Sequence, residues 1–201
     1  MPALPPHLVL ASASPRRREI LEAVGLDLRV LPVNVDESPR TGEDPAEFVL
    51  RLARAKALAV SPGEAGGLPV LGADTAVVLD GAILGKPASR EEARGMLQAL
   101  AGRVHEVLTG VALVLPGGGV LDGVERTRVR FAPLREEEIE RYLDGVEPWD
   151  KAGAYGIQGA AGWFVTRIEG SVSNVIGLPL SLVRELWLRA GLPLPTLRGL
   201  R

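Results

Sequence analysis

The amino-acid sequence predicts an α/β protein in which helices flank a mixed β-sheet. In the first half, apolar strand-like runs alternate with helical segments, and in the second half two long β segments are joined by a glycine-rich turn. The 201 residues hold no repeat or long linker, and they suffice for one compact domain or two closely packed lobes. We expect a single domain over residues 1–201, with residues 192–201 as a loose tail.

Capping and turn residues set the elements of the first half. Ser14 and Pro15 are residue types that begin a helix, and Gly25 is typical of the position just past its end. Asp44 and Ser89 each begin a capping-box-like sequence. In chain order we expect a strand over 7–11, a helix between Ser14 and Gly25, a strand over 28–33 and a polar loop over 34–43. A helix over 44–60, a turn-rich break over 62–67, a strand over 69–79 with a short antiparallel return over 82–84, and a helix over 89–102 should follow.

The second half begins with the two long β segments, 104–115 and 120–131, which the glycine-rich turn should pair in antiparallel fashion. The remaining expected elements are a helix over 135–143, a Gly-rich loop over 150–159, a strand over 163–168 and a last helix over 180–190.

Composition excludes several classes of function. The 23 basic and 25 acidic residues give a net charge of −2, so no overall basic field indicates DNA or RNA as a partner. Cysteine is absent, which excludes disulfides, a thiolate nucleophile and a Cys-based zinc site. We find no signal peptide and no run near the roughly 20 apolar residues that span a bilayer. We therefore expect a cytoplasmic protein without a membrane partner.

The first strand-to-helix turn carries an arginine cluster, Arg16 to Arg18. Cations are disfavoured at a helix N-terminus, but a bound polyanion would reverse this effect, and the guanidinium fork matches phosphate oxygens. We expect this turn, with Ser12, to bind phosphate. The alternative is that the arginines are solvated or paired with Glu19 and Glu22, and for Arg18 we favour this alternative.

Lys56 is a charged residue at an unusual position, because a helical wheel places it between Leu52 and Val49 on the inward side of its helix. A buried ammonium needs an anion. Either a protein carboxylate or a substrate phosphate would satisfy it.

Asp74 interrupts an otherwise apolar strand, so it needs a cation, a metal or several hydrogen bonds. Lys86 returns beyond the following turn and is a candidate partner, the alternative being a purely structural Asp–Lys bridge. Asp36 and Glu37 are further candidate metal ligands. Carboxylates with few other ligands suit Mg²⁺ or Mn²⁺, which often bridge phosphates.

Other catalytic arrangements are not supported. The chain has two histidines, and it lacks HExxH, GxSxG and a Walker sequence. We interpret His105 as structural. Tyr155 and Gln158 in the Gly-rich loop are candidates for contact with a base edge, the alternative being an irregular connection.

Five blocks in this order resemble the Maf family of nucleoside-triphosphate pyrophosphatases: LASASPRR, VDE, RLARAKA, GADT with LGKP, and DKAGAYGIQG followed by GSVSNVIGLPL. The resemblance covers about residues 8–188. It implies a fold similar to that of inosine triphosphatases, with a cleft between two lobes, and a homodimer. It also implies hydrolysis of a nucleoside triphosphate to the monophosphate and pyrophosphate with a divalent cation, Mg²⁺ or Mn²⁺.

The resemblance also implies residue roles. Asp74 matches the proton acceptor, and Arg16, Thr75 and Gln158 match specificity positions. The positions that bind phosphates or metal are Ser12, Arg17, Glu37, Lys56 and Lys86. The GADT and AYGIQG versions are similar to the branch that acts on dTTP and UTP, whereas the branch for 7-methyl-GTP carries Gln after the Asp. Val172 departs from the tyrosine-containing version of its block.

Two alternatives stay open on the sequence. One is a broader pyrophosphatase that removes modified nucleoside triphosphates. The other is a module that binds a triphosphate and regulates a partner without catalysis.

Overall fold

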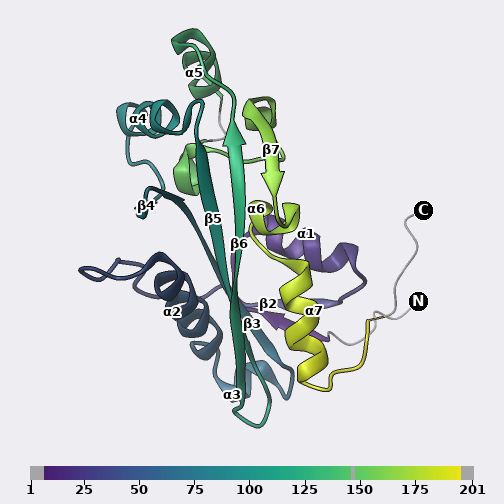
Figure 1. The fold of residues 1–201 in the computed structure, drawn as a ribbon. Coiled ribbons are helices and arrows are strands. Elements are labelled where there is room, and N and C mark those ends of the chain that lie inside the picture. Colours follow the sequence, from purple (N-terminus) through teal and green to yellow (C-terminus); the bar gives the residue numbers. More distant parts are fainter. Residues whose placement is uncertain (1–6, 146–147, 196–201) are drawn as a thin grey trace.

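The computed structural model describes residues 7–145 and 148–195, and within them it confirms a mixed sheet flanked by helices (Figure 1). The strands are β1 Leu8–Leu10, β2 Leu28–Val30, β3 Val70–Leu79, β4 Ala82–Leu84, β5 Val104–Val114, β6 Val120–Phe131 and β7 Val165–Glu169. The helices are α1 Pro15–Ala23, α2 Pro45–Leu58, α3 Pro62–Ala65, α4 Arg90–Leu100, α5 Glu136–Leu143, α6 Val172–Ile176 and α7 Leu180–Arg189. Three short 3₁₀ helices are η1 Pro148–Asp150, η2 Ala152–Ala154 and η3 Ala160–Phe164.

One seven-stranded sheet connects all of these elements. Its order is β2-β1-β3-β5-β6-β7, and β4 pairs with β3. The β1–β2 and β1–β3 pairs are parallel, whereas the other pairs are antiparallel. The expected hairpin is present as β5 and β6, which pair from Val104 opposite Arg130 to Val114 opposite Val120. The division into two lobes stays a prediction, because the described strands form a single sheet.

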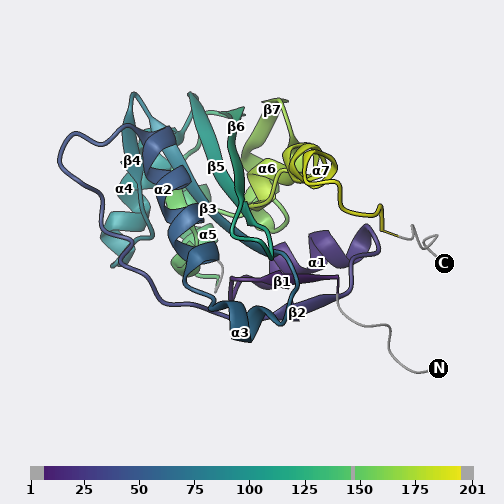
Figure 2. The same ribbon diagram turned by 90° about the horizontal axis from the view of Figure 1, so that it is seen from below.

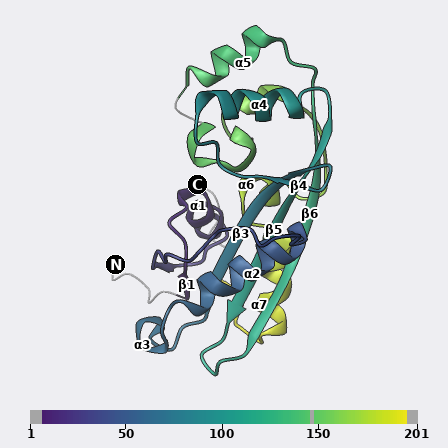
Figure 3. The same cartoon turned by 90° about the vertical axis from the view of Figure 1, so that its left-hand side faces the viewer.

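Helices cover both faces of this sheet (Figures 2 and 3). Helix α2 packs on one face, where Ala53 and Ala57 meet Val9 of β1. Helices α1 and α7 pack on the other face around Leu8 and Leu71. At the far end of the hairpin, α4 and α5 enclose a further apolar cluster with β5, β6 and η3. Successive residues of a strand alternate between faces, so each strand supplies both cores.

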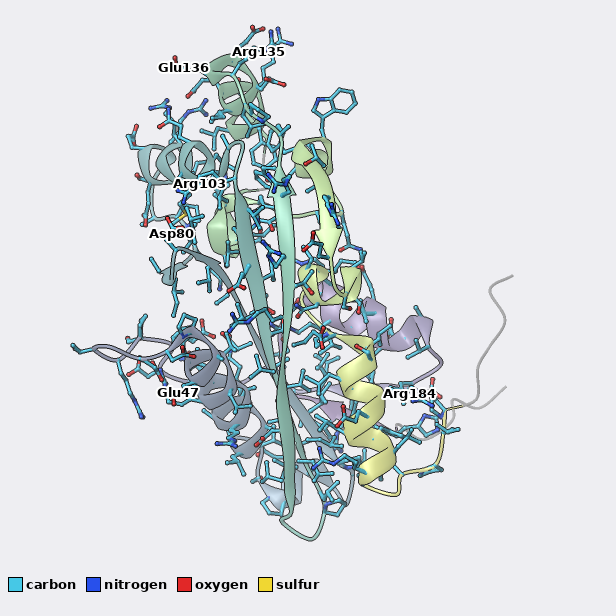
Figure 4. All side chains as sticks on the ribbon, in the orientation of Figure 1. Glu47, Asp80, Arg103, Arg135, Glu136 and Arg184 are labelled. Carbon is cyan, nitrogen blue, oxygen red and sulfur yellow. The ribbon has the colours of Figure 1, made fainter. Side chains whose placement is uncertain are left out.

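Side chains outside these cores reach solvent (Figure 4). Glu47 on α2 and Arg184 on α7 are exposed and lie on opposite sides of the sheet. Arg135 and Glu136 lie at the far end, where α5 begins. Asp80, in the turn after β3, pairs with Arg103 at 2.5 Å. Among the described residues, no helix is both long and apolar enough to cross a membrane.

Two glycines let α2 lie directly against the sheet. A Cβ built on Gly72 of β3 would lie 2.3 Å from the Ala53 carbonyl oxygen, and one on Gly110 of β5 would lie 2.3 Å from that of Val49. A side chain at either position would therefore push the helix outward. Helix α2 thus occupies the space that the absent side chain of Gly72 leaves beside β3.

One edge of β3 is only partly covered. The other edge pairs with β5 from Val70 to Val78. On the partly covered edge, away from β5, β1 pairs with Val70 and Leu71, and β4 pairs with Val77 to Leu79. Within the described ranges no strand pairs with residues 72–76 here, because the chain leaves β1 to begin α1. The sheet therefore has a gap beside residues 72–76 of β3, between β1 and β4, and side chains from both faces of β3 can reach this gap.

Some predicted elements are wrong in type or extent. The strand expected over 163–168 begins at Val165, because Trp163 lies in η3 with 85% of its surface exposed. The break over 62–67 contains the one-turn helix α3, whose N-terminus is stabilised by a capping box between Ser61 and Glu64. Helix α6 was not predicted. In the expected loose tail, the Pro193 carbonyl accepts a hydrogen bond from Trp187 Nε1 at 2.9 Å, and residues 196–201 lie outside the described part.

Candidate functional site

A pocket of about 570 Å³ opens at the gap beside β3. Its walls come from the start of α1, from α2, β3 and β4, from the loop around residues 150–159, and from the end of α6. Most of the predicted site residues line it together: Arg16, Arg17, Glu37, Lys56, Asp74, Thr75, Lys86 and Gln158. Segments more than 140 residues apart in sequence thus share one opening. The roles assigned to these residues stay predictions.

Two predicted residues lie outside this lining. Ser12 is buried behind the wall, where its Oγ accepts hydrogen bonds from the Ser14 backbone N–H at 3.2 Å and from Arg17 Nη1 at 3.3 Å. The Asp36 carboxylate is exposed and accepts from the Ser38 N–H at 2.9 Å. Ser12 therefore supports a wall residue, and Asp36 shapes the loop next to Glu37.

Lys56 joins the two carboxylates of the pocket. It is 8% exposed, and its Nζ lies 2.6 Å from Asp74 Oδ1 and 2.5 Å from Glu37 Oε1. The ammonium projects inward because helix α2 presses this side against the sheet, as the helical wheel predicted. Its partners in this structure are protein carboxylates. The ion-pair partner of Asp74 is Lys56 of α2, so the structural bridge between Asp74 and Lys86, which was the alternative considered for these two residues, is not the pairing that the structure shows.

The two carboxylates differ in acidity. Burial raises the pKa of Asp74 above its ordinary value, and the opposing charges of Lys56 and Arg17 only partly offset this effect. Burial also acts to raise the pKa of Glu37, but the hydrogen bond and charge of Lys56, with help from Lys86, bring that pKa below its ordinary value. The pocket therefore makes Asp74 more basic than an ordinary aspartate and Glu37 less basic than an ordinary glutamate.

The three arginines of the first turn have separate environments. The Arg18 Nε pairs with Glu22 at 2.7 Å on the surface, which confirms the favoured alternative for that residue. Arg16 lines the pocket, and its Nη1 lies 3.6 Å from Asp150 Oδ2. Arg17 points into the wall. Lys86 lies exposed at the opposite rim, and none of the described residues gives it a hydrogen bond or an ion pair.

Arg17 makes four hydrogen bonds to the protein. Its Nη1 donates to the Ala73 carbonyl at 2.8 Å and to Ser12 Oγ at 3.3 Å. Its Nη2 donates to Thr75 Oγ1 at 3.1 Å, and its Nε donates to the Gly177 carbonyl at 2.9 Å. The guanidinium thus ties β3 to the segment that follows α6.

Sequence reasoning missed the polar residues behind Thr75. The Thr75 and Thr109 hydroxyls lie 2.9 Å apart. Asn174 of α6 is fully buried, and its Nδ2 donates to the Val107 carbonyl and to Thr127 Oγ1, each at 2.9 Å. Thr109 and Asn174 thus fix α6 against β5. A threonine in the apolar run 107–114 was the available signal for this network.

Tyr155 packs into the core beside the pocket. It is 5% exposed, and its hydroxyl lies 2.7 Å from His105 Nε2. Both rings pack edge-on against Phe131. Burial lowers the pKa of His105 to about 4, which confirms a structural histidine that is neutral at pH 7. Of the two residues expected at a base edge, Gln158 is the exposed one.

Glu37 and Asp74 are the candidate metal ligands of the pocket. Among the described residues no group of three or more His, Cys, Asp or Glu side chains is placed to hold a metal ion. Glu37 and Asp74 do share one cation, the Lys56 ammonium, so both face a common position. Two carboxylates with phosphate oxygens and waters form a donor set that suits Mg²⁺. The pair therefore fits a metal that arrives with a phosphate ligand.

Comparison with known proteins gives consistent matches over most of the chain. Residues 7–190 match the family described as Maf-like protein. A dTTP/UTP pyrophosphatase of Anaeromyxobacter sp. (strain Fw109-5) is 57% identical over 193 residues, which cover 94% of this chain and 92% of that protein. One of Hahella chejuensis (strain KCTC 2396) is 53% identical over 176 residues, with 87% of each chain covered. A solved structure, the Staphylococcus aureus Ham1 protein, aligns at 16% identity and a TM-score of 0.43, covering 62% of this chain and 71% of that chain.

Proposed function

Because this chain belongs to the Maf family, we propose that it is a nucleotide pyrophosphatase that hydrolyses dTTP and UTP to the monophosphate and pyrophosphate. Relatives that are 50–57% identical over most of their length are named for this activity. The observation that carries the proposal is the shared pocket, in which a buried Lys56 faces Asp74 and Glu37 while Arg16 and Lys86 line the same opening.

The basic residues of the pocket suit a triphosphate. Arg16, Lys56 and Lys86 would neutralise the phosphates and the leaving pyrophosphate, the main electrostatic task in phosphoryl transfer. The start of α1 adds backbone N–H groups, since Ser14 lines the pocket and makes no side-chain cap with its helix. On the other wall, Thr75 and the exposed Gln158 would contact the base.

Asp74 would act as the proton acceptor. A water molecule attacks the α-phosphorus, its proton passes to the Asp74 carboxylate, and the bond from the α-phosphorus to the bridging oxygen breaks to release pyrophosphate. The raised pKa of Asp74 makes it a better base than an ordinary aspartate. Lys56 holds this carboxylate in place and is near enough to share its charge with an incoming phosphate.

We also propose that Glu37 and Asp74 hold a divalent cation, Mg²⁺ or Mn²⁺. Such a cation would neutralise phosphate charge and polarise the reacting phosphoryl group. Chelation should abolish turnover, and either metal should restore it. A full rate in the presence of a chelator would remove the metal from the proposal.

A panel of triphosphates tests the function. Pyrophosphate release is measured with dTTP, UTP, ATP, 7-methyl-GTP and modified triphosphates, each with Mg²⁺ or Mn²⁺. The proposal expects dTTP and UTP to have the highest kcat/KM values. Equal turnover of modified nucleotides would favour the broader pyrophosphatase. Tight binding in calorimetry with no turnover would favour the non-catalytic module.

We further propose that the protein is a cytoplasmic homodimer, as the family resemblance implies. Nucleoside triphosphates are made and used in that compartment. Sedimentation should give twice the 21.3 kDa mass of the chain, and a mass of one chain at micromolar concentration would contradict the dimer.

A further inference from the structure

In the described part of the chain, the gap in the sheet leaves a segment of one edge of β3 without a strand partner. Along the parallel pairing with β1, the Val9 N–H donates to the Pro69 carbonyl and the Ala11 N–H donates to the Leu71 carbonyl, each at 2.9 Å. The next acceptor in this series is the carbonyl of Ala73. By that point the first strand has ended and the chain has turned toward α1. A buried carbonyl left without a donor would be costly.

Arg17 supplies the missing donor. Its Nη1 lies 2.8 Å from the Ala73 oxygen, the distance of an ordinary sheet hydrogen bond. The same guanidinium holds Thr75 Oγ1 at 3.1 Å. Ala73 and Thr75 are the two neighbours of Asp74, so one planar group holds a backbone carbonyl on one side of Asp74 and a side-chain hydroxyl on the other. The bonds to Ser12 and to the Gly177 carbonyl anchor the guanidinium from behind.

These bonds leave Arg17 little capacity for a ligand. A guanidinium has five N–H donors, and the wall takes four of them. Arg16 contrasts with this, because its side chain is 31% exposed and its nearest acid, Asp150, lies at 3.6 Å. The two adjacent arginines thus differ: Arg17 is hydrogen-bonded within the pocket wall, whereas Arg16 is available to bind a ligand at the opening.

We propose that Arg17 is a positioning residue that takes the place of a missing strand and fixes Asp74 for proton transfer, whereas Arg16 contacts the phosphates. This inference rests on the proposed function. It differs from what the family resemblance implied for Arg17, namely substrate binding. The planar fork is essential to the role, since a lysine ammonium cannot reach the Ala73, Thr75 and Gly177 acceptors together.

Matched substitutions separate the two roles. Arg17→Lys should lower kcat for dTTP about 100-fold, the scale expected when a catalytic group is misplaced. Its KM, and the inhibition constant of inorganic pyrophosphate, should stay within about 3-fold of the wild-type values, because the phosphate contacts remain. Arg16→Lys should do the reverse, weakening pyrophosphate inhibition with a smaller loss of kcat. Circular dichroism and a thermal melt establish that each variant is folded.

The opposite pattern would overturn the proposal. If Arg17→Lys keeps kcat and weakens pyrophosphate as Arg16→Lys does, Arg17 binds phosphate. If wild-type protein fails to hydrolyse dTTP and UTP, the proposed function fails, and a labelling experiment on the wild type still decides the place of Arg17.

That experiment treats wild-type protein with phenylglyoxal, which modifies accessible guanidinium groups, followed by mass spectrometry. Arg16 should be modified and should be protected by inorganic pyrophosphate. Arg17 should stay unmodified in both conditions. Modification of Arg17 that pyrophosphate prevents would show that Arg17 is a phosphate ligand, whether or not the Arg17→Lys variant folds.

Discussion

At the residue scale, the cluster of Asp74, Lys56 and Glu37 shows how a strand can carry a buried carboxylate. Burial alone disfavours the charged form of Asp74, and the ammonium at 2.6 Å offsets only part of that cost. The remaining cost is what makes the carboxylate basic. Stability and reactivity therefore oppose each other at this residue.

Asp74→Asn should lower kcat by about 10²–10⁴, the usual contribution of a positioned base. Nucleotide affinity in calorimetry should change little, because Lys56 keeps its bond to Glu37. Asp36→Asn, outside the pocket lining, is the control, and unchanged kcat in Asp74→Asn would remove Asp74 from the mechanism.

His105 should make the fold sensitive to mild acid. The unfolded chain takes up a proton near pH 6.5, but the buried imidazole does so only near pH 4. The contribution of His105 to the free energy of unfolding should therefore be constant above pH 6.5 and fall by about 1.4 kcal/mol per pH unit from 6.5 to 4. Urea unfolding at pH 7 and pH 5 measures this. His105→Gln, which can still bond to Tyr155, should reduce the slope, and an equal slope in both proteins would contradict the prediction.

The sequence was sufficient to predict most charged residues of the pocket. Lys56 and Asp74 stand out because each is a charge inside an apolar pattern. The placement of Arg17 could not be predicted in this way. Two of its acceptors are backbone carbonyls that lie 56 and 160 residues away, and a carbonyl has no sequence signature.

At the scale of elements, the contact between α2 and the sheet places Lys56 within reach of Asp74. Gly72 and Gly110 allow this contact, because any side chain there would meet the helix backbone. Helix α2 begins at Asp44, whose carboxylate accepts from the Ala46 N–H at 2.8 Å. The position of the ammonium thus depends on one cap and two glycines.

Gly110→Ala should destabilise the fold by about 3 kcal/mol, because its Cβ would lie 2.3 Å from a backbone oxygen that cannot move independently of α2. Turnover should fall as well, since α2 carries Lys56. Gly95→Ala is the matched control. Gly95 lies within α4 with nothing near its built Cβ, so alanine there should stabilise the protein by about 0.5–1 kcal/mol. Urea unfolding measures both, and a Gly110→Ala protein as stable as the wild type would contradict the prediction.

Elements with strong local signals were predicted, and those that tertiary contacts decide were not. The helix starts after Ser14 and Asp44 and the hairpin of β5 and β6 agree with the structure, although only the Asp44 side chain caps its helix by a hydrogen bond. Helix α6 has five residues, and buried hydrogen bonds from Asn174 hold it in place. Trp163 is a strand-favouring residue, but among the described residues no strand pairs with it, and the pairing of β7 with β6 begins at Val165.

At the scale of the whole molecule, one sheet connects all of the apolar clusters. Strand β3 contributes Leu71 to the cluster under α1 and α7, and Leu79 to the cluster under α4 and α5. No described boundary divides the sheet into separately packed halves. The sequence predicted the sheet and its helices, but the order of its strands depends on long-range pairing that local patterns do not encode.

The protein should therefore unfold in one cooperative transition. Far-UV circular dichroism reports the whole fold, and Trp187 reports the cluster under α7, where it is buried. In a variant with Trp149→Phe and Trp163→Phe, tryptophan fluorescence and circular dichroism should give the same urea midpoint. Separate midpoints would show two independently stable lobes.

The gap beside β3 has a consequence for any attempt to change which nucleotide this protein prefers. Asp74 and Thr75 are consecutive residues whose side chains leave the strand on opposite faces, and both reach the pocket only because the neighbouring strand is missing. A library of replacements at position 75 would also disturb its neighbour, so altered preference there would come with slower turnover. Gln158 is exposed on a separate loop, so under the proposed function we expect replacements at this position to change selectivity with a smaller effect on turnover.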